Sequence, residues 1–156
     1  MDDNTRVLIL GSLPGERSLA AQEYYAHRTN AFWWLMGGVL GEGGLADKPY
    51  AERLHRLRGH RVGLWDVIAQ GDRQGSLDSA IRHATERDLS GFATGLPALR
   101  AIAFNGGEAA RRGRRQLADH AARWTLIDLP SSSAAYAAMP RTAKLAAWNS
   151  IRDFLR

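Results

Sequence analysis

A turn bounded by glycine and proline follows the first apolar run of the chain, and its position suits ligand binding. Residues 7–10 (VLIL) predict a buried strand, and the turn that follows is Gly11-Ser12-Leu13-Pro14-Gly15. Such a turn carries backbone N–H groups to the carboxyl edge of a sheet, where α/β proteins bind ligands. A short way along the chain, Asn30 stands alone among the aromatic residues of segment 24–34 (YYAHRTNAFWW). Rings with one polar group suit a base or a sugar held by stacking and a hydrogen bond.

Polar residues also follow three other predicted strands. Asp66 comes directly after the strand 61–65, and Asn105 comes directly after the strand 98–104. The strand 124–127 leads into the loop Leu129-Pro130-Ser131-Ser132-Ser133. Because the carboxyl ends of parallel strands meet at one edge of a sheet, we expect these groups to converge on the first turn. Taken singly, an Asp or Asn at a strand end is more often a helix cap or a turn former than a catalytic group.

Helices alternate with these strands along the chain. Apolar periodicity and capping residues predict helices over 18–26, with Ser18 as N-cap, 30–40, 48–58, 108–120 and 140–154, and a loop over 71–76. Strands separated by helices indicate βαβ units, and hence an α/β fold with a mostly parallel sheet covered on both faces. A length of 156 residues is enough for one domain with one sizeable core.

Composition excludes several classes of chemistry. The chain has no cysteine, so disulfides, thiolate nucleophiles, cysteine-bound zinc and iron–sulfur clusters are excluded. The histidines contain no H-x-x-x-H pair, which disfavours a metal hydrolase or a zinc deaminase; they are His27, His55, His60, His83 and His120. The first turn is neither a G-x-G-x-x-G fingerprint nor a phosphate loop, since no Lys-Ser/Thr follows it.

The charge balance favours a polyanionic partner without establishing one. The chain carries 21 Lys and Arg against 16 Asp and Glu, a net charge of +5. Its densest basic cluster lies in a predicted helix and is best interpreted as a solvated face: Arg111-Arg112-Gly113-Arg114-Arg115. No apolar run reaches the length of a membrane span. The acidic residues 1–4 lead straight into a strand, so we expect no signal peptide and a cytoplasmic protein.

Seven blocks of the sequence carry a family resemblance over nearly the whole chain. They are residues 8–15 (LILGSLPG), 18–19 (SL), 24–33 (Tyr-Tyr-Ala-His-x-x-Asn-x-Phe-Trp), 64–68 (LWDVI), 75–79 (GSLDS), 104–106 (FNG) and 129–133 (LPSSS). In residues and order they resemble the hypoxanthine-DNA glycosylase branch of the uracil-DNA glycosylase superfamily. The resemblance implies a three-layer αβα sandwich around a short, mostly parallel four-stranded sheet, formed as one domain by residues 1–156.

The same resemblance implies an enzyme of base excision repair. It would be a monofunctional DNA glycosylase that flips out a deaminated base, either hypoxanthine or uracil or both, and hydrolyses its N-glycosidic bond. An abasic site would remain in the DNA, and no cofactor would be needed. The expected partner is double-stranded DNA, with single-stranded DNA left open, and the protein is expected to be a monomer that binds no membrane.

The resemblance also implies roles for residues at the predicted edge of the sheet. Asn30 takes the place of the catalytic asparagine of the branch, whose carbonyl dipole orients water and favours the sugar cation. Asn30 can also cap the helix beginning at Ala31, and the two roles are compatible. Phe32 stacks on the flipped base or is plain core. Asp66 accepts the N1–H of hypoxanthine or the N3–H of uracil, or else caps a helix or forms a turn. The other expected base contacts are Gly11, Ser12, Leu13 and Asn105.

The expected DNA contacts flank this base site. Pro14 and Gly15 belong to the first turn. The loop Pro130-Ser131-Ser132-Ser133 resembles the second signature loop, which grips phosphates in relatives. Arg141 and Lys144, at the start of the last helix, are expected to meet phosphates beside that loop, with a solvated helix surface as the alternative.

Three positions depart from the family pattern. Leu13 stands where many members carry an Asp or Asn that orients water, and Leu129 stands where many carry a His that stabilises the leaving anion. Ala134 replaces the usual proline, and the loop tip is small where others place a bulky wedge. Two other functions stay open: a noncatalytic DNA-binding protein of the same fold, and a hydrolase of free nucleosides. The sequence does not rank hypoxanthine against uracil or xanthine.

Overall fold

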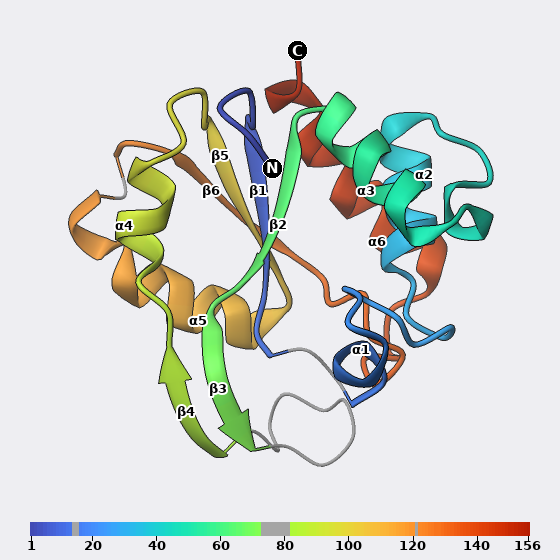
Figure 1. The fold of residues 1–156 in the computed structure, drawn as a ribbon, viewed down its shortest axis with the longest axis horizontal. Helices are drawn as coiled ribbons and strands as arrows, with labels where there is room; N and C mark the ends of the chain where they lie inside the picture. Colours follow the sequence, from blue (N-terminus) through green and yellow to red (C-terminus); the bar gives the residue numbers. More distant parts are fainter. Residues whose placement is uncertain (14–15, 73–81, 121) are drawn as a thin grey trace.

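A computed structural model describes residues 1–13, 16–72, 82–120 and 122–156 (Figure 1). Two of the expected DNA contacts, Pro14 and Gly15, and the block 75–79 lie outside the described residues. Among the described residues, no helix is both long enough and apolar enough to span a membrane.

A sheet of four parallel strands forms the middle layer. Its strands are β1 (Val7–Gly11), β2 (Val62–Asp66), β5 (Ala101–Asn105) and β6 (Thr125–Leu129), in the spatial order β2-β1-β5-β6. All five residues of β1 and of β5 are buried, as expected for parallel strands covered on both faces. The sheet is therefore as the sequence predicts.

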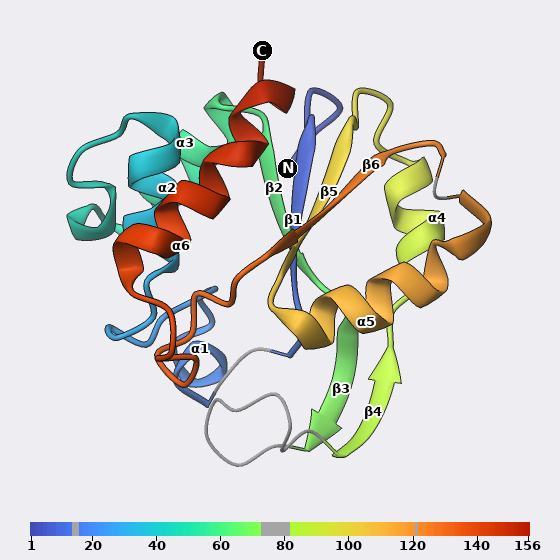
Figure 2. The same ribbon diagram turned by 180° about the vertical axis from the view of Figure 1, so that it is seen from behind.

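Helices cover both faces of this sheet (Figures 1 and 2). On one side lie α2 (Phe32–Leu40), α3 (Tyr50–Gly59) and α6 (Arg141–Trp148); on the other lie α4 (Leu89–Thr94) and α5 (Gly107–Gln116). Side chains alternate along a strand. Val7 and Ile9 therefore pack in the core on the face covered by α2, α3 and α6, while Leu8 and Leu10 pack in the core on the face covered by α4 and α5. The predicted three-layer αβα sandwich is confirmed.

Short elements complete the chain. They are α1 (Glu16–Ala21), the 3₁₀ turns η1 (Leu45–Asp47), η3 (Ala118–His120) and η4 (Asn149–Phe154), and the strands β3 (Ile68–Asp72) and β4 (Arg82–Glu86). The antiparallel pair β3–β4 was not predicted, and neither was α4. Contacts distant in sequence support the pair: the Glu86 carboxylate accepts hydrogen bonds from Arg112 (2.8 Å) and Arg115 (2.6 Å) of α5. The solvated-face interpretation of the arginine cluster holds for Arg111, Arg114 and Arg115, which are exposed, but not for Arg112, whose side chain is only 14% exposed.

The predicted helix 18–26 is wrong in its extent. Helix α1 ends at Ala21, and Ser18 lies inside it rather than at its N-cap. The Ser18 hydroxyl instead accepts a hydrogen bond from the Ala26 N–H at 3.0 Å. Gln22 (φ 54°) and Tyr25 (φ 55°) have left-handed backbone conformations, which a continuing right-handed helix cannot contain.

Candidate active site

The four strand ends meet at one edge of the sheet, as predicted. In the parallel register Gly11 lies beside Asp66, and Asn105 lies beside Leu129. A Cβ placed on Gly11 would lie 2.8 Å from Oδ1 of Asp66 and 3.1 Å from the hydroxyl oxygen of Tyr25. Glycine at position 11 therefore allows the backbone, a carboxylate and a phenol to meet at one point.

Asp66 brings negative charge into this buried edge. Its side chain is on the last residue of β2, and the residue is only 6% exposed. The next two N–H groups, of Val67 and Ile68, donate to the carbonyls of Gly11 and Ser12, both at 2.9 Å. Burial, and after it the charge of Asp66, raises the pKa of the Tyr24 phenol to about 12. The site thus places a buried carboxyl group near a phenol that stays protonated at neutral pH.

Asn30 is fixed by the start of α2. Its Oδ1 accepts a hydrogen bond from the Phe32 N–H at 3.0 Å, and its own N–H donates to the His27 carbonyl at 2.9 Å. The first of these is a capping contact, made one residue before Ala31, which is the N-cap by backbone position. A carbonyl oxygen has two acceptor sites, so the contact orients the amide without using its full acceptor capacity.

Phe32 lies deeper than we expected. It is completely buried, and the Tyr25 ring stacks on it with centroids 4.0 Å apart and an interplanar angle of 18°. The rings of Trp33 and Trp148 meet Phe32 edge-on at 4.9 and 5.7 Å. Tyr25 is only half-buried, so it is the ring of this stack that faces the site. The signal in the sequence was the pair of tyrosines at the start of the aromatic segment.

Neighbouring side chains hold the two tyrosines in place. The Tyr24 N–H donates to the Tyr50 hydroxyl at 3.0 Å, and the Trp33 indole N–H donates to the Tyr24 carbonyl at 3.2 Å. The guanidinium of Arg53 lies over the Trp33 ring, 4.7 Å from its centroid. These contacts fix the backbone of Tyr24. The next residue, Tyr25, has a left-handed backbone conformation, which costs free energy in a residue other than glycine.

Asn105 and Ser132 bind each other rather than facing the site. The Asn105 Nδ2 donates to the Ser132 hydroxyl at 2.8 Å, and the Ser132 N–H donates to Asn105 Oδ1 at 2.9 Å. Both residues are buried, at 6% and 1% exposure. We expected a base contact for Asn105 and a DNA contact for Ser132. The structure instead uses both side chains to join β5 to the second loop.

Comparisons with known proteins agree with this geometry. The family model of the uracil DNA glycosylase superfamily matches residues 1–152. The chain belongs to this superfamily. Its membership makes the protein a DNA glycosylase, a hydrolase of N-glycosyl bonds in DNA.

Individual relatives carry two names, hypoxanthine DNA glycosylase and uracil DNA glycosylase. A hypoxanthine DNA glycosylase of Methanosarcina acetivorans is 46% identical over 109 residues, which are 70% of this chain and 68% of the relative. A hypoxanthine DNA glycosylase of Methanosarcina barkeri is 41% identical over 106 residues, 68% of this chain and 66% of the relative. The solution structure of a candidate uracil DNA glycosylase from M. acetivorans has a TM-score of 0.85 and 38% identity, covering 99% of this chain and 93% of that one.

The second loop of this glycosylase is held by hydrogen bonds from α6 and from the residue that precedes α2. The Trp148 indole N–H donates to the Pro130 carbonyl at 2.9 Å, and the Ala31 N–H donates to the Ser132 carbonyl at 2.9 Å. The second contact ties the loop to the residue that follows Asn30. Pro130, Ser131 and Ser133 are half-buried, so they keep surface for the predicted DNA contacts.

The two basic residues of α6 have different surroundings. Arg141 is exposed, and its guanidinium lies over the Trp34 ring, 4.1 Å from the centroid. Lys144 is only 5% exposed, and its ammonium donates to the carbonyls of Ser133 (3.3 Å) and Tyr136 (2.9 Å). The structure contradicts both readings of Lys144, a phosphate contact and a solvated helix surface. Helix periodicity alone did not reveal this, because the loop covers the lysine.

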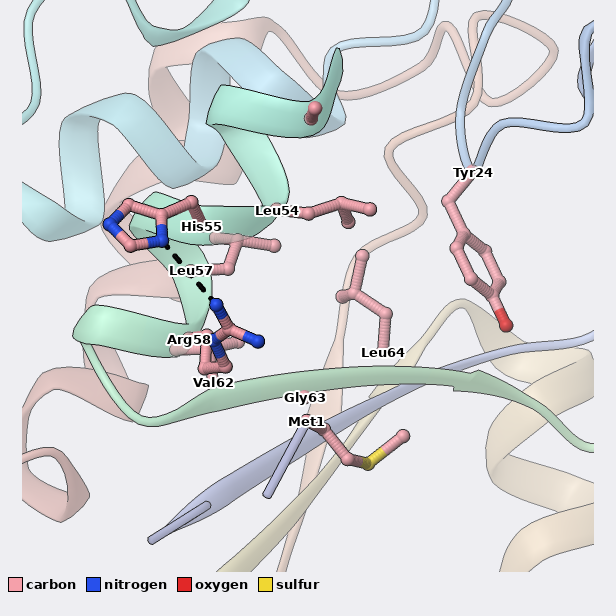
Figure 3. A pocket seen from close by; sticks show the side chains of 10 residues that line it. Met1, Tyr24, Leu54, His55, Leu57, Arg58, Val62, Gly63 and Leu64 are labelled. Atoms are coloured by element: carbon pink, nitrogen blue, oxygen red, sulfur yellow. Dashed lines mark hydrogen bonds between the residues drawn. The ribbon is translucent and has the colours of Figure 1, made fainter.

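A separate pocket lies between α3 and the edge strand β2 (Figure 3). It measures about 390 Å³ and is lined largely by apolar side chains such as Leu54, Leu57 and Leu64. Tyr24 stands at one end of it, with its hydroxyl directed toward the β2 ribbon. Across the described ranges, no group of three or more His, Asp or Glu side chains is placed to hold a metal ion. The absence of a cofactor stays a prediction.

Proposed function

We propose that the protein excises hypoxanthine, uracil or both from DNA and leaves an abasic site. The observation that carries this proposal is the buried carboxylate of Asp66 beside the Gly11 backbone. Ala31, which follows Asn30, is bonded to Ser132 of the loop after β6. The two relatives named hypoxanthine DNA glycosylases support hypoxanthine as the first base to test.

Asp66 selects the base by the proton on its polar edge. A carboxylate accepts the N1–H of hypoxanthine or the N3–H of uracil, whereas adenine and cytosine lack this proton. Guanine and thymine share it, so their 2-amino and 5-methyl groups must be excluded by the shape of the pocket. Gly11, Asp66 and Tyr25 approach one another closely, which limits the space available for these groups.

The half-buried ring of Tyr25 supplies the stacking surface. Its inner face lies on Phe32, which is itself enclosed by Trp33 and Trp148. A ring packed in this way is rigid, so a flipped base stacks on it without a further loss of side-chain entropy from the tyrosine. In this assignment Phe32 supports the platform, and Tyr25 touches the base.

Asn30 acts on the sugar and the water. Its amide cannot take a proton effectively, so it orients a water molecule toward C1′ and stabilises the oxocarbenium-like sugar with its carbonyl dipole. The C1′–N bond breaks, and the base leaves with the electron pair and takes a proton from solvent. The water oxygen bonds to C1′ and gives one of its protons to solvent, which leaves a hydroxyl on the sugar. The capping bond to Phe32 preorganises the amide for this role.

Double-stranded DNA is the proposed partner of a monomer, with single-stranded DNA open. The candidate phosphate contacts are Pro130, Ser131, Ser133 and Arg141, which lie on the second loop and the adjoining end of α6. Because Lys144 is buried, Arg141 is the basic contact that α6 can offer beside this loop.

A panel of duplexes tests the proposal. Each duplex carries one hypoxanthine, uracil or xanthine, and abasic sites are scored after incubation with the protein. We expect release of hypoxanthine or uracil and no release from undamaged DNA. Binding without release from any duplex would favour the noncatalytic alternative. Release from free nucleosides alone would favour a nucleoside hydrolase.

A further inference from the structure

The buried lysine of α6 is an unusual feature of a chain whose basic residues are nearly all arginine. The chain has two lysines, Lys48 and Lys144. Lys48 pairs with Glu52 at 3.6 Å on a partly exposed surface. The ammonium of Lys144 is buried instead, and its hydrogen bonds go to two uncharged carbonyls. Burial lowers the pKa of Lys144. A buried charge held by carbonyls alone is costly, so its geometry calls for a role.

The two carbonyls belong to the ends of one turn. The Tyr136 N–H donates to the Ser133 carbonyl at 3.1 Å, which closes a turn over residues 133–136. The Ser133 hydroxyl accepts the Ala135 N–H at 3.2 Å within the same turn. Lys144 therefore bonds to the first and last residues of the turn and fixes its orientation on α6.

The turn presents an aromatic ring to solvent. Tyr136 is 44% exposed, and it is the one aromatic residue among the exposed large hydrophobics of the described ranges. The Lys144 ammonium lies 5.4 Å from the centroid of its ring. Ala134 and Ala135 beside it are exposed and small, so no neighbouring side chain of the turn competes with the ring for contact.

We propose that Lys144 is a positioning residue whose clamp on the turn 133–136 directs the Tyr136 ring into the DNA beside the flipped nucleotide. The proposal rests on the proposed function. An exposed aromatic ring fills the space that a base leaves when it is extruded, and it stacks on the neighbouring bases. Tyr136 thus supplies the bulk that Ala134 and Ala135 lack. A ring on an unclamped turn would lose orientation, and the opened duplex would lose its support.

The experiment compares four variants on two substrates. The variants are Lys144→Met, Tyr136→Ala, the double variant, and Thr142→Ala as a control at an exposed residue of the same helix. The substrates are a duplex with one hypoxanthine and the same damaged strand alone. The measurements are the single-turnover excision rate at saturating enzyme, the salt dependence of binding, and hydrogen exchange of residues 133–136.

Lys144→Met and Tyr136→Ala should each lower the excision rate from the duplex about tenfold, because the flipped state of a duplex costs unpairing and unstacking energy. Excision from the single strand should change less than about twofold, since no partner strand opposes flipping. The excision rate of the double variant should lie within about twofold of that of either single variant, because both changes disrupt the same Lys144–Tyr136 arrangement. Lys144→Met should also speed hydrogen exchange in the turn.

Three results would overturn the proposal. Equal losses on duplex and single strand would make Lys144 a merely structural residue. Additive losses in the double variant would mean that Lys144 does not act through Tyr136. A salt slope reduced by about one unit at an unchanged saturating rate would make Lys144 a phosphate contact, and we expect no such change in Thr142→Ala.

The outcomes separate this proposal from the proposed function. If the wild-type protein released no base from either strand, the proposed function would fail, while hydrogen exchange in Lys144→Met would still test the clamp. Tyr136→Ala changes an exposed side chain, so it tests the DNA contact even if Lys144→Met fails to fold.

Discussion

The side-chain amide of Asn105 holds Ser132 at two points, through the serine hydroxyl (2.8 Å) and the serine N–H (2.9 Å). The Ser132 carbonyl in turn accepts the N–H of Ala31 at 2.9 Å, next to Asn30. One buried residue of the second loop therefore connects the end of β5 to the start of α2. The loop that faces DNA and the segment that carries the catalytic candidate are fixed to each other.

Asn105→Ala should lower the free energy of unfolding by about 1–3 kcal/mol, because the Ser132 N–H is buried and loses its acceptor. Ser132→Ala leaves the buried Nδ2 of Asn105 without its acceptor and should also cost about 1–3 kcal/mol. Urea unfolding measures both, with the exposed Asn4→Ala as control. The excision rate of Asn105→Ala should also fall at urea concentrations too low to unfold the variant. If Asn105→Ala proved as stable and as active as Asn4→Ala, the Asn105–Ser132 hydrogen bonds would contribute neither to stability nor to activity.

Asn30→Ala should lower the excision rate by roughly 10² to 10³ while DNA binding persists, as expected of a group that acts in the transition state. The change also removes the bond to the Phe32 N–H, so a loss of about 1 kcal/mol of stability accompanies it.

Asp88→Ala is the matched control for that loss of stability. The Asp88 carboxylate accepts the Gly91 N–H at the start of α4, on the other face of the sheet. This variant should lose similar stability with its excision rate intact. Equal loss of rate in both variants would leave Asn30 as a helix cap alone.

The sequence predicted the strands that position the site better than it predicted the side-chain contacts within the site. The parallel strands and their shared edge followed from short apolar runs alternating with helices, and they placed Asp66 and Asn105 correctly. Local patterns could not show that Asn105 binds Ser132, because the pairing depends on the register of β5 and β6. The burial of Lys144 likewise depends on a loop that folds over α6. The turn that ends α1 early lies beside contacts of the same kind, since Tyr50 and Trp33 bond to the backbone of Tyr24.

Asp66→Asn should change which bases are released. An amide presents a donor as well as an acceptor, so the preference for a base with an imino N–H should weaken. The measurement is the ratio of single-turnover rates for hypoxanthine and uracil against the other bases of the panel. An unchanged ratio with a uniformly lower rate would show that Asp66 supports the fold of the edge and does not read the base.

Stability should fall in alkaline solution, partly through Tyr24. Burial and the charge of Asp66 raise the pKa of Tyr24 to about 12 from 10. Its contribution is complete below the unfolded value and is lost as the pH rises from 10 toward 12, because the unfolded phenol ionises first. Urea unfolding between pH 9 and 12 should show a shallower decline in Tyr24→Phe. The exposed Tyr136→Phe should decline like the wild type; a parallel decline in Tyr24→Phe would refute the assignment.

The enzyme should leave the DNA backbone intact after it releases the base. A lyase reaction begins when an unprotonated amine attacks C1′ of the abasic sugar and forms an imine. Lys48 is paired with Glu52, and the Lys144 amine is buried between two carbonyls, so neither lysine is presented to the sugar. Strand cleavage should therefore appear only after alkali treatment of the product. Borohydride added during turnover should trap no protein–DNA adduct, with a known lyase as positive control. A trapped adduct that disappears in Lys144→Met would show that the turn opens on DNA and frees the amine.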